Sequence, residues 1–437
     1  MTEPAATPEP GSAASPAAPA GSTGAPARRR PRWLAWLMIL GPGLIAANAG
    51  NDAGGIATYA SAGAEFGYAT LFVMVLVTIA LVVVQEMSAR IGVHTGEGLM
   101  SLIREQFPLR ASAFAIVCLL VANLGLVVSE FAGIGAAFEL FGVTRYIAVP
   151  IAAVVIWAVV VLGDYRWAER IFLILGLAFI AYPIAAVLGD PDWGAVASNM
   201  VRPHFVWSKE FLFLCVALIG TTITPYMQLY QAAAVADRGT DPEDYRMVKI
   251  DTITGAIFAN VVSMAIIIAT ATAIGGTGPL TSAKEAAEAL EPVAGAGAEV
   301  LFGIGLLGAS ALAAAVVPLA TSYAVAEALG VERSVSKTFR EAPLFMGLFT
   351  ALVVIGAGVA LIPGNLITLL LNMQVVNGII APIVLTFLLI LANRRGVLGD
   401  AVNGPRFRIV ATVCVVVIAV LAAVVFAQTV AGWFGLV

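Results

Sequence analysis

An aspartate inside the first apolar segment is the residue of this sequence best placed to do chemistry. Asp52 lies in the glycine-rich stretch 48–55, with apolar residues before it (33–47) and after it (56–64). Each glycine destabilises a helix by roughly 1 kcal/mol relative to alanine. A charge near mid-bilayer costs at least about 2.5 kcal/mol unless it has a partner or water, and unwound backbone is tolerated there only beside a cavity. The pattern predicts a cation site in a broken first membrane span.

A second interruption is predicted in the sixth apolar segment, over residues 220–227. Pro225 removes a backbone donor and clashes with the preceding turn of a helix. Three nearby threonines offer hydroxyl oxygens to the freed backbone or to a ligand: Thr221, Thr222 and Thr224. Taken alone, the proline is explained as well by a simple kink. Two interrupted spans at corresponding places in two halves of a chain instead favour a transporter with its site near the midplane.

The residue types in the two breaks favour a hard cation. Neither break contains His or Cys, and the oxygen donors are one carboxylate, hydroxyls and freed carbonyls, which suit Mg²⁺, Mn²⁺ or Ca²⁺. Met227 is the one soft side chain near the second break, and we assign it to packing. A single carboxylate is too little for a dehydrated divalent ion, whereas Mg²⁺ often keeps several waters beside one carboxylate. Small residues at Ala53, Gly54 and Gly55 leave room for such waters.

Other polar residues inside the apolar segments have two interpretations each. Glu130 in the third span is either a second acid that attracts the cation or a structural partner of backbone amides. Gln374 in the tenth span either orients a metal-bound water or bonds between helices. The two histidines, His94 and His204, fall near span ends, so a buried histidine proton relay is not expected.

Composition places the chain among polytopic membrane proteins, because 60% of its residues are hydrophobic and only 11% are charged. We expect an all-α protein with eleven spans: about 33–64 (broken), 68–92, 111–141, 146–162, 168–188, 207–237 (broken), 250–274, 298–329, 342–362, 365–392 and 408–434. With the N-terminus inside, 19 of the 23 Lys and Arg residues face the cytoplasm. This bias predicts a cytoplasmic N-terminus and an outside C-terminus.

The same pattern predicts the domain organisation. Residues 1–32 form a disordered tail, rich in Ala, Pro, Ser and Gly, that ends in a basic anchor. Residues 33–434 form one transmembrane transport domain. Its breaks in spans one and six imply two five-helix repeats of opposite topology, at about 33–190 and 205–395, with an extra helix at about 408–434.

At these residues the sequence resembles the Nramp family of divalent metal transporters over roughly 33–395. The resemblance rests on four stretches: Gly41-Pro42-Gly43, residues 52–68 with Phe66-Gly67-Tyr68, residues 217–226, and Gln374-Val375-Val376. The resemblance implies the LeuT-type 5+5 inverted repeat, which agrees with the two predicted breaks.

Several positions depart from the typical family pattern. Typical members carry Asp-Pro-Gly-Asn in the first break, whereas this chain keeps the acid, Asp52, and has Gly55 in place of the asparagine. Typical members carry Met-Pro-His in the sixth span, whereas this chain has Thr224 and Tyr226 around the proline. A family aspartate in span three aligns with Val127, and the ninth span lacks the family's basic residues.

These departures resemble the prokaryotic Nramp-related magnesium transporters, which move Mg²⁺ and Mn²⁺ without the proton coupling of the main family. By matched position, Ala49 and Thr221 would offer backbone carbonyls and Asp52 the negative charge. Gly55 and Thr224 would supply space or contacts to water. The expected metal-contacting set is completed by Gln374 and Glu130.

The expected function is therefore proton-uncoupled transport of partly hydrated Mg²⁺, and also Mn²⁺, by alternating access. One alternative is a proton-coupled Mn²⁺/Fe²⁺ importer of the typical Nramp kind. Another is a membrane sensor that no longer transports, as in the plant relative that acts in ethylene signalling, although no output domain follows residue 434. An enzyme is disfavoured because no nucleophile–base pair, metal-ligand cluster or phosphate loop is apparent.

The expected surroundings follow from this function. We expect an integral protein of the bacterial cytoplasmic membrane, in contact with the lipid bilayer and with its metal substrate. We expect no cofactor and no nucleic-acid partner, and a monomer is the simplest assembly.

Overall fold

The computed structural model describes residues 52–162, 175, 177–239, 241–331 and 339–434, all within the compact unit Ile39–Val437. Every regular element in these ranges is helical. The predicted tail and basic anchor, the first half of span one (33–51) and the start of span five (168–174) lie outside the described residues.

Each of the eleven predicted spans has at least a partial helical counterpart among the described residues. These are α2 (Ala53–Phe66), α3 (Leu71–Thr95), α5 (Leu109–Leu140), α6 (Arg145–Leu162), α8 (Ala181–Leu188), the pair α10 (Lys209–Thr222) and α11 (Pro225–Asp237), α12 (Tyr245–Ile274), α15 (Ala298–Leu329), α16 (Pro343–Ala360), α17 (Leu366–Ala392) and α19 (Pro405–Trp433). Nine segments of the described chain are long and apolar enough to cross a bilayer, one of them joining α2 to α3. The chain is therefore an integral membrane protein.

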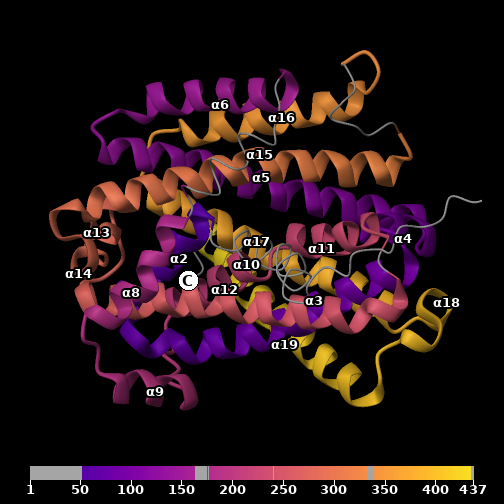
Figure 1. Ribbon diagram of the computed structural model, residues 1–437, viewed down its shortest axis with the longest axis horizontal. Coiled ribbons are helices and arrows are strands. Elements are labelled where there is room, and N and C mark those ends of the chain that lie inside the picture. Colours follow the sequence, from indigo (N-terminus) through magenta and orange to yellow (C-terminus); the bar gives the residue numbers. More distant parts are fainter. Residues whose placement is uncertain (1–51, 163–174, 176, 240, 332–338, 435–437) are drawn as a thin grey trace, which may run out of the picture. The chain divides into compact units, whose positions relative to one another are not determined.

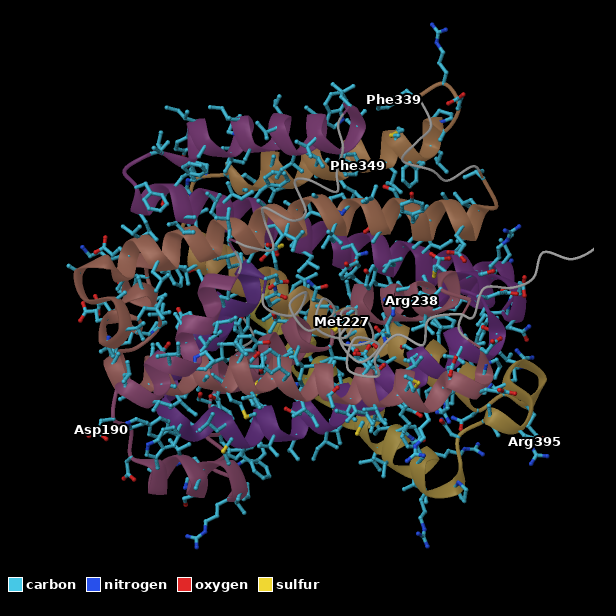
Figure 2. All side chains as sticks on the ribbon, viewed as in Figure 1. Asp190, Met227, Arg238, Phe339, Phe349 and Arg395 are labelled. Carbon is cyan, nitrogen blue, oxygen red and sulfur yellow. The ribbon has the colours of Figure 1, made fainter. Side chains whose placement is uncertain are left out.

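Shorter elements connect these helices. They are η1 (Gly67–Thr70), α4 (Leu99–Gln106), η2 (Leu177–Ile180), α9 (Trp193–Val201), η3 (Pro242–Asp244), α13 (Ala283–Glu288), α14 (Glu291–Ala294), η4 (Gly295–Gly297), α18 (Arg395–Leu398) and η5 (Gly399–Ala401). In Figure 1, α9, α13 and α14 lie toward the left of the view and α4 and α18 toward the right. Figure 2 likewise places Asp190 and Arg395 on opposite sides. This separation agrees with the alternation of the predicted spans, while the direction of insertion stays a prediction.

Several helices from the first half of the chain pack against helices from the second half. The second span packs on the seventh (α3 on α12), the third on the eighth (α5 on α15) and the fourth on the ninth (α6 on α16). Helix α2 of the first span and α10, the first half-helix of the sixth span, also contact each other. Contacts of the first four spans with the sixth to ninth are expected if the two halves form an inverted repeat. The helices α2, α10, α12 and α17 surround the centre of the view in Figure 1.

Glycines bring α10 and α17 into backbone contact. A Cβ atom built on Gly220 of α10 would lie 1.9 Å from the carbonyl oxygen of Gln374 on α17. Reciprocally, a Cβ atom on Gly378 of α17 would lie 2.3 Å from the carbonyl oxygen of Val216. Small residues allow this approach, which van der Waals packing stabilises in lipid. The approach fixes the position of Gln374 along the sixth span.

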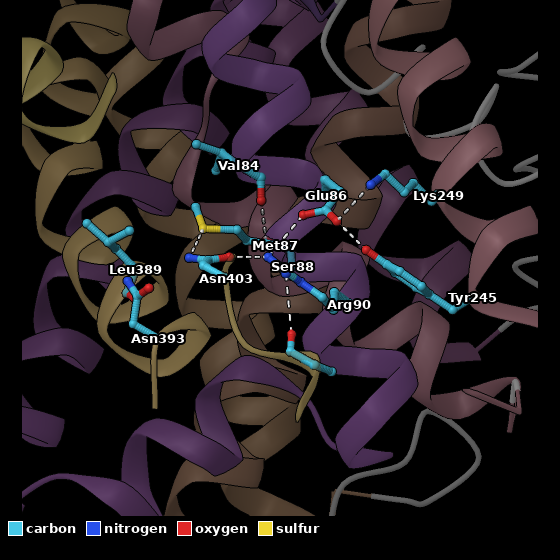
Figure 3. A network of polar contacts seen from close by, with 11 residues as sticks. Val84, Glu86, Met87, Ser88, Arg90, Tyr245, Lys249, Leu389, Asn393 and Asn403 are labelled. Atoms are coloured by element: carbon cyan, nitrogen blue, oxygen red, sulfur yellow. Dashed lines mark hydrogen bonds and ion pairs between the residues drawn. The ribbon is translucent and has the colours of Figure 1, made fainter. Parts of the chain in front are cut away.

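A polar network ties α3 to α12 and to the connector that precedes α19 (Figure 3). The buried carboxylate of Glu86 forms ion pairs with Arg90 at 3.1 Å and Lys249 at 3.6 Å, and it accepts a hydrogen bond from the Tyr245 hydroxyl. The Arg90 guanidinium in turn donates to the side-chain oxygen of Asn403. One carboxylate thus holds together helices from both predicted repeats.

Candidate metal transport site

Asp52 is the first described residue of the chain and lies directly before α2. Asp52 has extended backbone angles (φ -73°, ψ 177°), and its Oδ1 accepts a hydrogen bond of 2.6 Å from the Gly55 N–H. This is an N-cap, which satisfies one of the backbone donors left free at a helix start. The helix therefore begins at Ala53, three residues earlier than the predicted Ile56, so Gly54 and Gly55 are helical. Asp52 itself is buried, with 3% of its surface exposed.

The second break is confirmed and is only two residues long. Helix α10 ends at Thr222, and α11 begins at Pro225 after an extended Thr224. Proline at the first helical position loses nothing by lacking an N–H, since that donor would have no partner there. In a continuous helix, however, residue 225 would donate to the carbonyl of Thr221. The proline therefore leaves the Thr221 carbonyl without this helical partner, as the predicted ligand role requires.

Glu130 of α5 lies at the start of α2. Its Oε2 accepts a hydrogen bond of 3.4 Å from the Ala53 N–H, and the side chain is fully buried. The positive end of a helix dipole stabilises a carboxylate at this place. Its Oε1 has no hydrogen-bond partner. Glu130 thus fits both interpretations drawn from the sequence, because one oxygen bonds an amide and the other is free for a ligand.

Gln374 of α17 reaches the same end of α2. A Cβ atom built on Gly54 would lie 1.8 Å from the Gln374 Nε2 atom. This nitrogen donates to the Ser129 hydroxyl of α5 at 3.5 Å. The carboxamide therefore lies against Gly54 of α2, two residues after Asp52, and against Ser129 of α5, which directly precedes Glu130. At this place it can contact a cation or its water.

Four of the predicted residues carry a buried oxygen without a hydrogen-bond partner. The buried atoms without a hydrogen bond include Glu130 Oε1, Gln374 Oε1, Thr221 Oγ1 and Thr224 Oγ1. An unpaired buried polar atom costs about 1–3 kcal/mol, so such atoms call for an explanation such as water or an ion. Among the described residues, no group of three or more His, Cys, Asp or Glu side chains could hold a metal. The available donors are oxygens, with few charges.

The remaining predicted positions are placed only in part. Ala49 lies outside the described residues. Gly55 is in the first turn of α2, where its N–H binds Asp52. Met227, labelled near the centre of the view in Figure 2, is 3% exposed and belongs to the apolar core, in agreement with the packing role assigned to it.

Two polar residues near the breaks were not singled out from the sequence. Tyr59 lies two turns after Asp52 on α2, and its hydroxyl is 3.0 Å from that of Thr222 on α10. Ser129 precedes Glu130 and bonds Gln374. The spacing of seven residues from Asp52 could have indicated Tyr59, since such residues share a helix face. Nothing in the sequence distinguishes Ser129 from serines that bond their own helix.

This geometry defines a class of protein. A helical membrane protein in which a buried acid caps the first described helix, the sixth span breaks beside buried oxygens, and spans of the two halves contact each other has the architecture of a secondary transporter with inverted repeats.

The chain belongs to the Nramp family, because the family model described as "Natural resistance-associated macrophage protein-like" matches residues 43–428. The match extends beyond residue 395, where the resemblance seen in the sequence ended. The divalent metal cation transporter MntH of Aeromonas hydrophila subsp. hydrophila is 28% identical over 396 residues, or 89% of this chain and 93% of that protein. MntH of Ralstonia nicotianae is 34% identical over 301 residues, or 64% of this chain and 66% of that protein.

Solved structures agree on the fold. The Eremococcus coleocola manganese transporter, in complex with an aromatic bis-isothiourea substituted compound, superimposes with a TM-score of 0.73 at 19% identity, covering 96% of this chain and 90% of that chain. MhsT in complex with L-phenylalanine superimposes with a TM-score of 0.53 at 15% identity, covering 86% and 97%. The LeuT-type fold expected from the sequence is thereby confirmed. The assignment to the magnesium branch stays a prediction.

Proposed function

We propose that this protein transports divalent metal ions, with Mg²⁺ as the main substrate and Mn²⁺ as a second one, without proton coupling. The observation that carries this proposal is the hydroxyl of Thr224, which is buried and without a hydrogen-bond partner in the second break. Typical family members have a soft methionine there. The relatives compared above are named as divalent metal cation or manganese transporters, which supports a divalent substrate.

The donor set supports an ion that keeps part of its water. Asp52 supplies one carboxylate, and the other candidate ligands are neutral oxygens or the second acid, Glu130. Mg²⁺ is bound in proteins through one or two carboxylates together with retained waters. Ions that prefer soft ligands gain little from such a site. We therefore assign Asp52, Ala49, Gly55, Thr221, Thr224, Gln374 and Glu130 to the metal path.

The absence of a proton relay is supported by Val127. It aligns with the family aspartate, and it is fully buried in the apolar core. Its Cγ1 lies close to α16: a Cβ atom on Gly356 would be only 2.5 Å away. This contact leaves no space or solvation for a charge between the third and ninth spans. The position of the family histidine is occupied by Tyr226.

In the proposed mechanism, the two repeats rock against each other and expose the breaks to one side of the membrane at a time. We propose the topology predicted from the basic residues, with the N-terminus in the cytoplasm and the C-terminus outside. The bacterial cytoplasmic membrane, a monomeric state, and the division into tail (1–32), two repeats and an extra helix belong to the same proposal.

Liposome uptake tests the site. Asp52→Ala is expected to abolish Mg²⁺ uptake by the purified protein, because the one acid of the first span is lost. Asp400→Ala, which removes an exposed carboxylate in η5, is expected to transport normally. Near-normal uptake by the Asp52 variant would refute the site.

The coupling mechanism is tested with a pH-sensitive dye inside the same liposomes. We expect Mg²⁺ entry with no acidification of the lumen. Acidification that follows metal entry would favour the alternative, a proton-coupled Mn²⁺/Fe²⁺ importer. Strong competition by Cd²⁺ would favour the same alternative, because a soft ligand binds Cd²⁺ tightly.

A further inference from the structure

Gln374 contacts three other helices, one through its backbone carbonyl and two through its side chain. Its backbone carbonyl lies against Gly220 of α10, where a Cβ atom would be 1.9 Å away. Its carboxamide lies against Gly54 of α2, where a Cβ atom would be 1.8 Å from Nε2 and 2.8 Å from Cδ. The Ser129 hydroxyl of α5 accepts the hydrogen bond from Nε2. Two glycines and one serine thus form a cradle around a single fully buried glutamine.

We propose that Ser129 and Gly54 are positioning residues that hold the Gln374 carboxamide with its oxygen directed to the transported cation or its water. This inference rests on the proposed function, because it explains how the Gln374 carboxamide is oriented to act as a ligand of the transported cation. Neither Ser129 nor Gly54 needs to touch the cation itself.

The chemistry of the carboxamide requires such a partner. A cation or its coordinated water needs the acceptor Oε1, whereas the NH₂ group carries two donors and repels a cation. When Oε1 turns to the ion, the buried NH₂ group must donate elsewhere. Ser129 supplies the acceptor, and Oε1 is the atom that has no partner in the protein. The hydrogen bond therefore selects the face of the amide that binds a cation.

Gly54 contributes space rather than a hydrogen bond. Any Cβ atom at this position would overlap the Gln374 carboxamide and would also come within 2.6 Å of the Ser129 oxygen. The side chain of Gln374 would have to leave the cradle. Gly54→Ala should consequently act like the loss of the carboxamide, although alanine is otherwise a better helix former than glycine.

Isothermal titration of the purified full chain with Mg²⁺, and separately with Mn²⁺, tests the proposal. Ser129→Ala is expected to weaken Mg²⁺ binding about tenfold, the size of effect of one unpaired buried donor. Gln374→Ala is expected to weaken it at least as much. Because Ser129 acts through Gln374, the double variant should bind like Gln374→Ala alone, and Gly54→Ala should add no further loss in the Gln374→Ala background.

Ser322→Ala is the matched control, since this fully buried serine bonds the Pro318 carbonyl of its own helix at 2.8 Å. It should bind Mg²⁺ within about twofold of the unmodified protein. Unchanged affinity in Ser129→Ala, or additive losses in the double variant, would overturn the proposal.

A structure of metal-free Ser129→Ala provides a readout that does not depend on the substrate. The Gln374 carboxamide is expected to leave its place against Gly54 or to turn over. If it stays in place, the proposal is wrong whatever ion the protein carries. Failure of the unmodified protein to bind either Mg²⁺ or Mn²⁺ would instead refute the proposed function, and the structure alone would then decide the positioning role.

Discussion

Thr224 is the residue at which the expected ion preference can be changed most directly. It precedes Pro225 in the second break, and its hydroxyl is buried without a partner. Thr224→Met would place a thioether where typical family members have one. We expect Cd²⁺ affinity to rise by at least about tenfold, because a soft sulfur ligand favours soft ions. Titration with Cd²⁺ and Mg²⁺ would measure the change.

Thr386→Met is a suitable control for this experiment. Thr386 lies on α17, is exposed, and bonds its own helix through the Pro382 carbonyl. A methionine there adds the same sulfur away from the breaks and should leave Cd²⁺ binding unchanged. Equal Cd²⁺ affinity in both variants would contradict a ligand position at residue 224.

At the level of residues, the sequence reveals a charged residue in an apolar span, but it does not reveal capping hydrogen bonds or packing contacts. Asp52 could be found because a lone acid in an apolar span is costly. Its N-cap role, and the helical state of Gly54 and Gly55, could not, since the glycines argued for a longer break. The contact between Gly54 and Gln374 depends on how three helices pack, which no local pattern encodes.

Among the helices, the close approach of α10 and α17 makes a strong steric prediction. Gly220→Ala would place a methyl group onto the Gln374 carbonyl, so we expect destabilisation of about 1–3 kcal/mol or more. Gly347→Ala on α16 has open space and should stabilise by up to about 1 kcal/mol. Thermal unfolding in detergent would compare the two. Similar melting temperatures would mean that the two backbones are not in contact.

The polar network around Glu86 predicts which of three substitutions destabilises the protein most. Glu86→Gln leaves the buried Arg90 without its ion pair and should cost about 3–5 kcal/mol. Tyr245→Phe removes one hydrogen bond, worth about 1 kcal/mol. Lys249→Ala should cost less than about 1 kcal/mol, because the Lys249 side chain is 43% exposed. Melting temperatures of the three variants would test the order, and a Lys249 variant less stable than the Glu86 variant would contradict it.

The number and positions of the helices follow from the length and polarity of the apolar segments. The break in span six was located by Pro225, but its predicted extent of 220–227 was too long. Gly220 weakens the helix by roughly 1 kcal/mol and the threonines weaken it less, but tertiary packing of α10 against α17 and α2 keeps residues 220–222 helical. Propensity alone could not set this boundary.

For the whole molecule, uncoupled transport predicts a strong dependence on membrane potential. A divalent ion gains about 4.6 kcal/mol per 100 mV on entering an inside-negative compartment. Mg²⁺ uptake by liposomes should therefore increase as a potassium diffusion potential is made more negative inside, and it should run down the chemical gradient alone at zero potential. Uptake that responded to a pH gradient but not to voltage would argue against a uniporter.

The contacts between helices of the two halves also bear on the proposed rocking of the two repeats. Contacts of α3 with α12 and of α5 with α15 join the two halves over long surfaces. If the two repeats rock against each other, some of these helix contacts must change while others are kept. The Glu86 network, which joins α3, α12 and the connector before α19, identifies elements that we expect to move together.

The cap at the start of α2 has a consequence for selectivity against larger ions. The Gly55 N–H uses one lone pair of Asp52 Oδ1, so an ion chelated by both carboxylate oxygens would share Oδ1 with the first turn of the helix. Ca²⁺, with its six to eight ligands and frequent bidentate carboxylates, would draw on Oδ1 and weaken this capping hydrogen bond. A small octahedral ion that binds only one oxygen of Asp52 would leave the capping hydrogen bond from Gly55 intact. The capped start of α2 would thereby favour ions that bind one oxygen of Asp52 over ions that bind both.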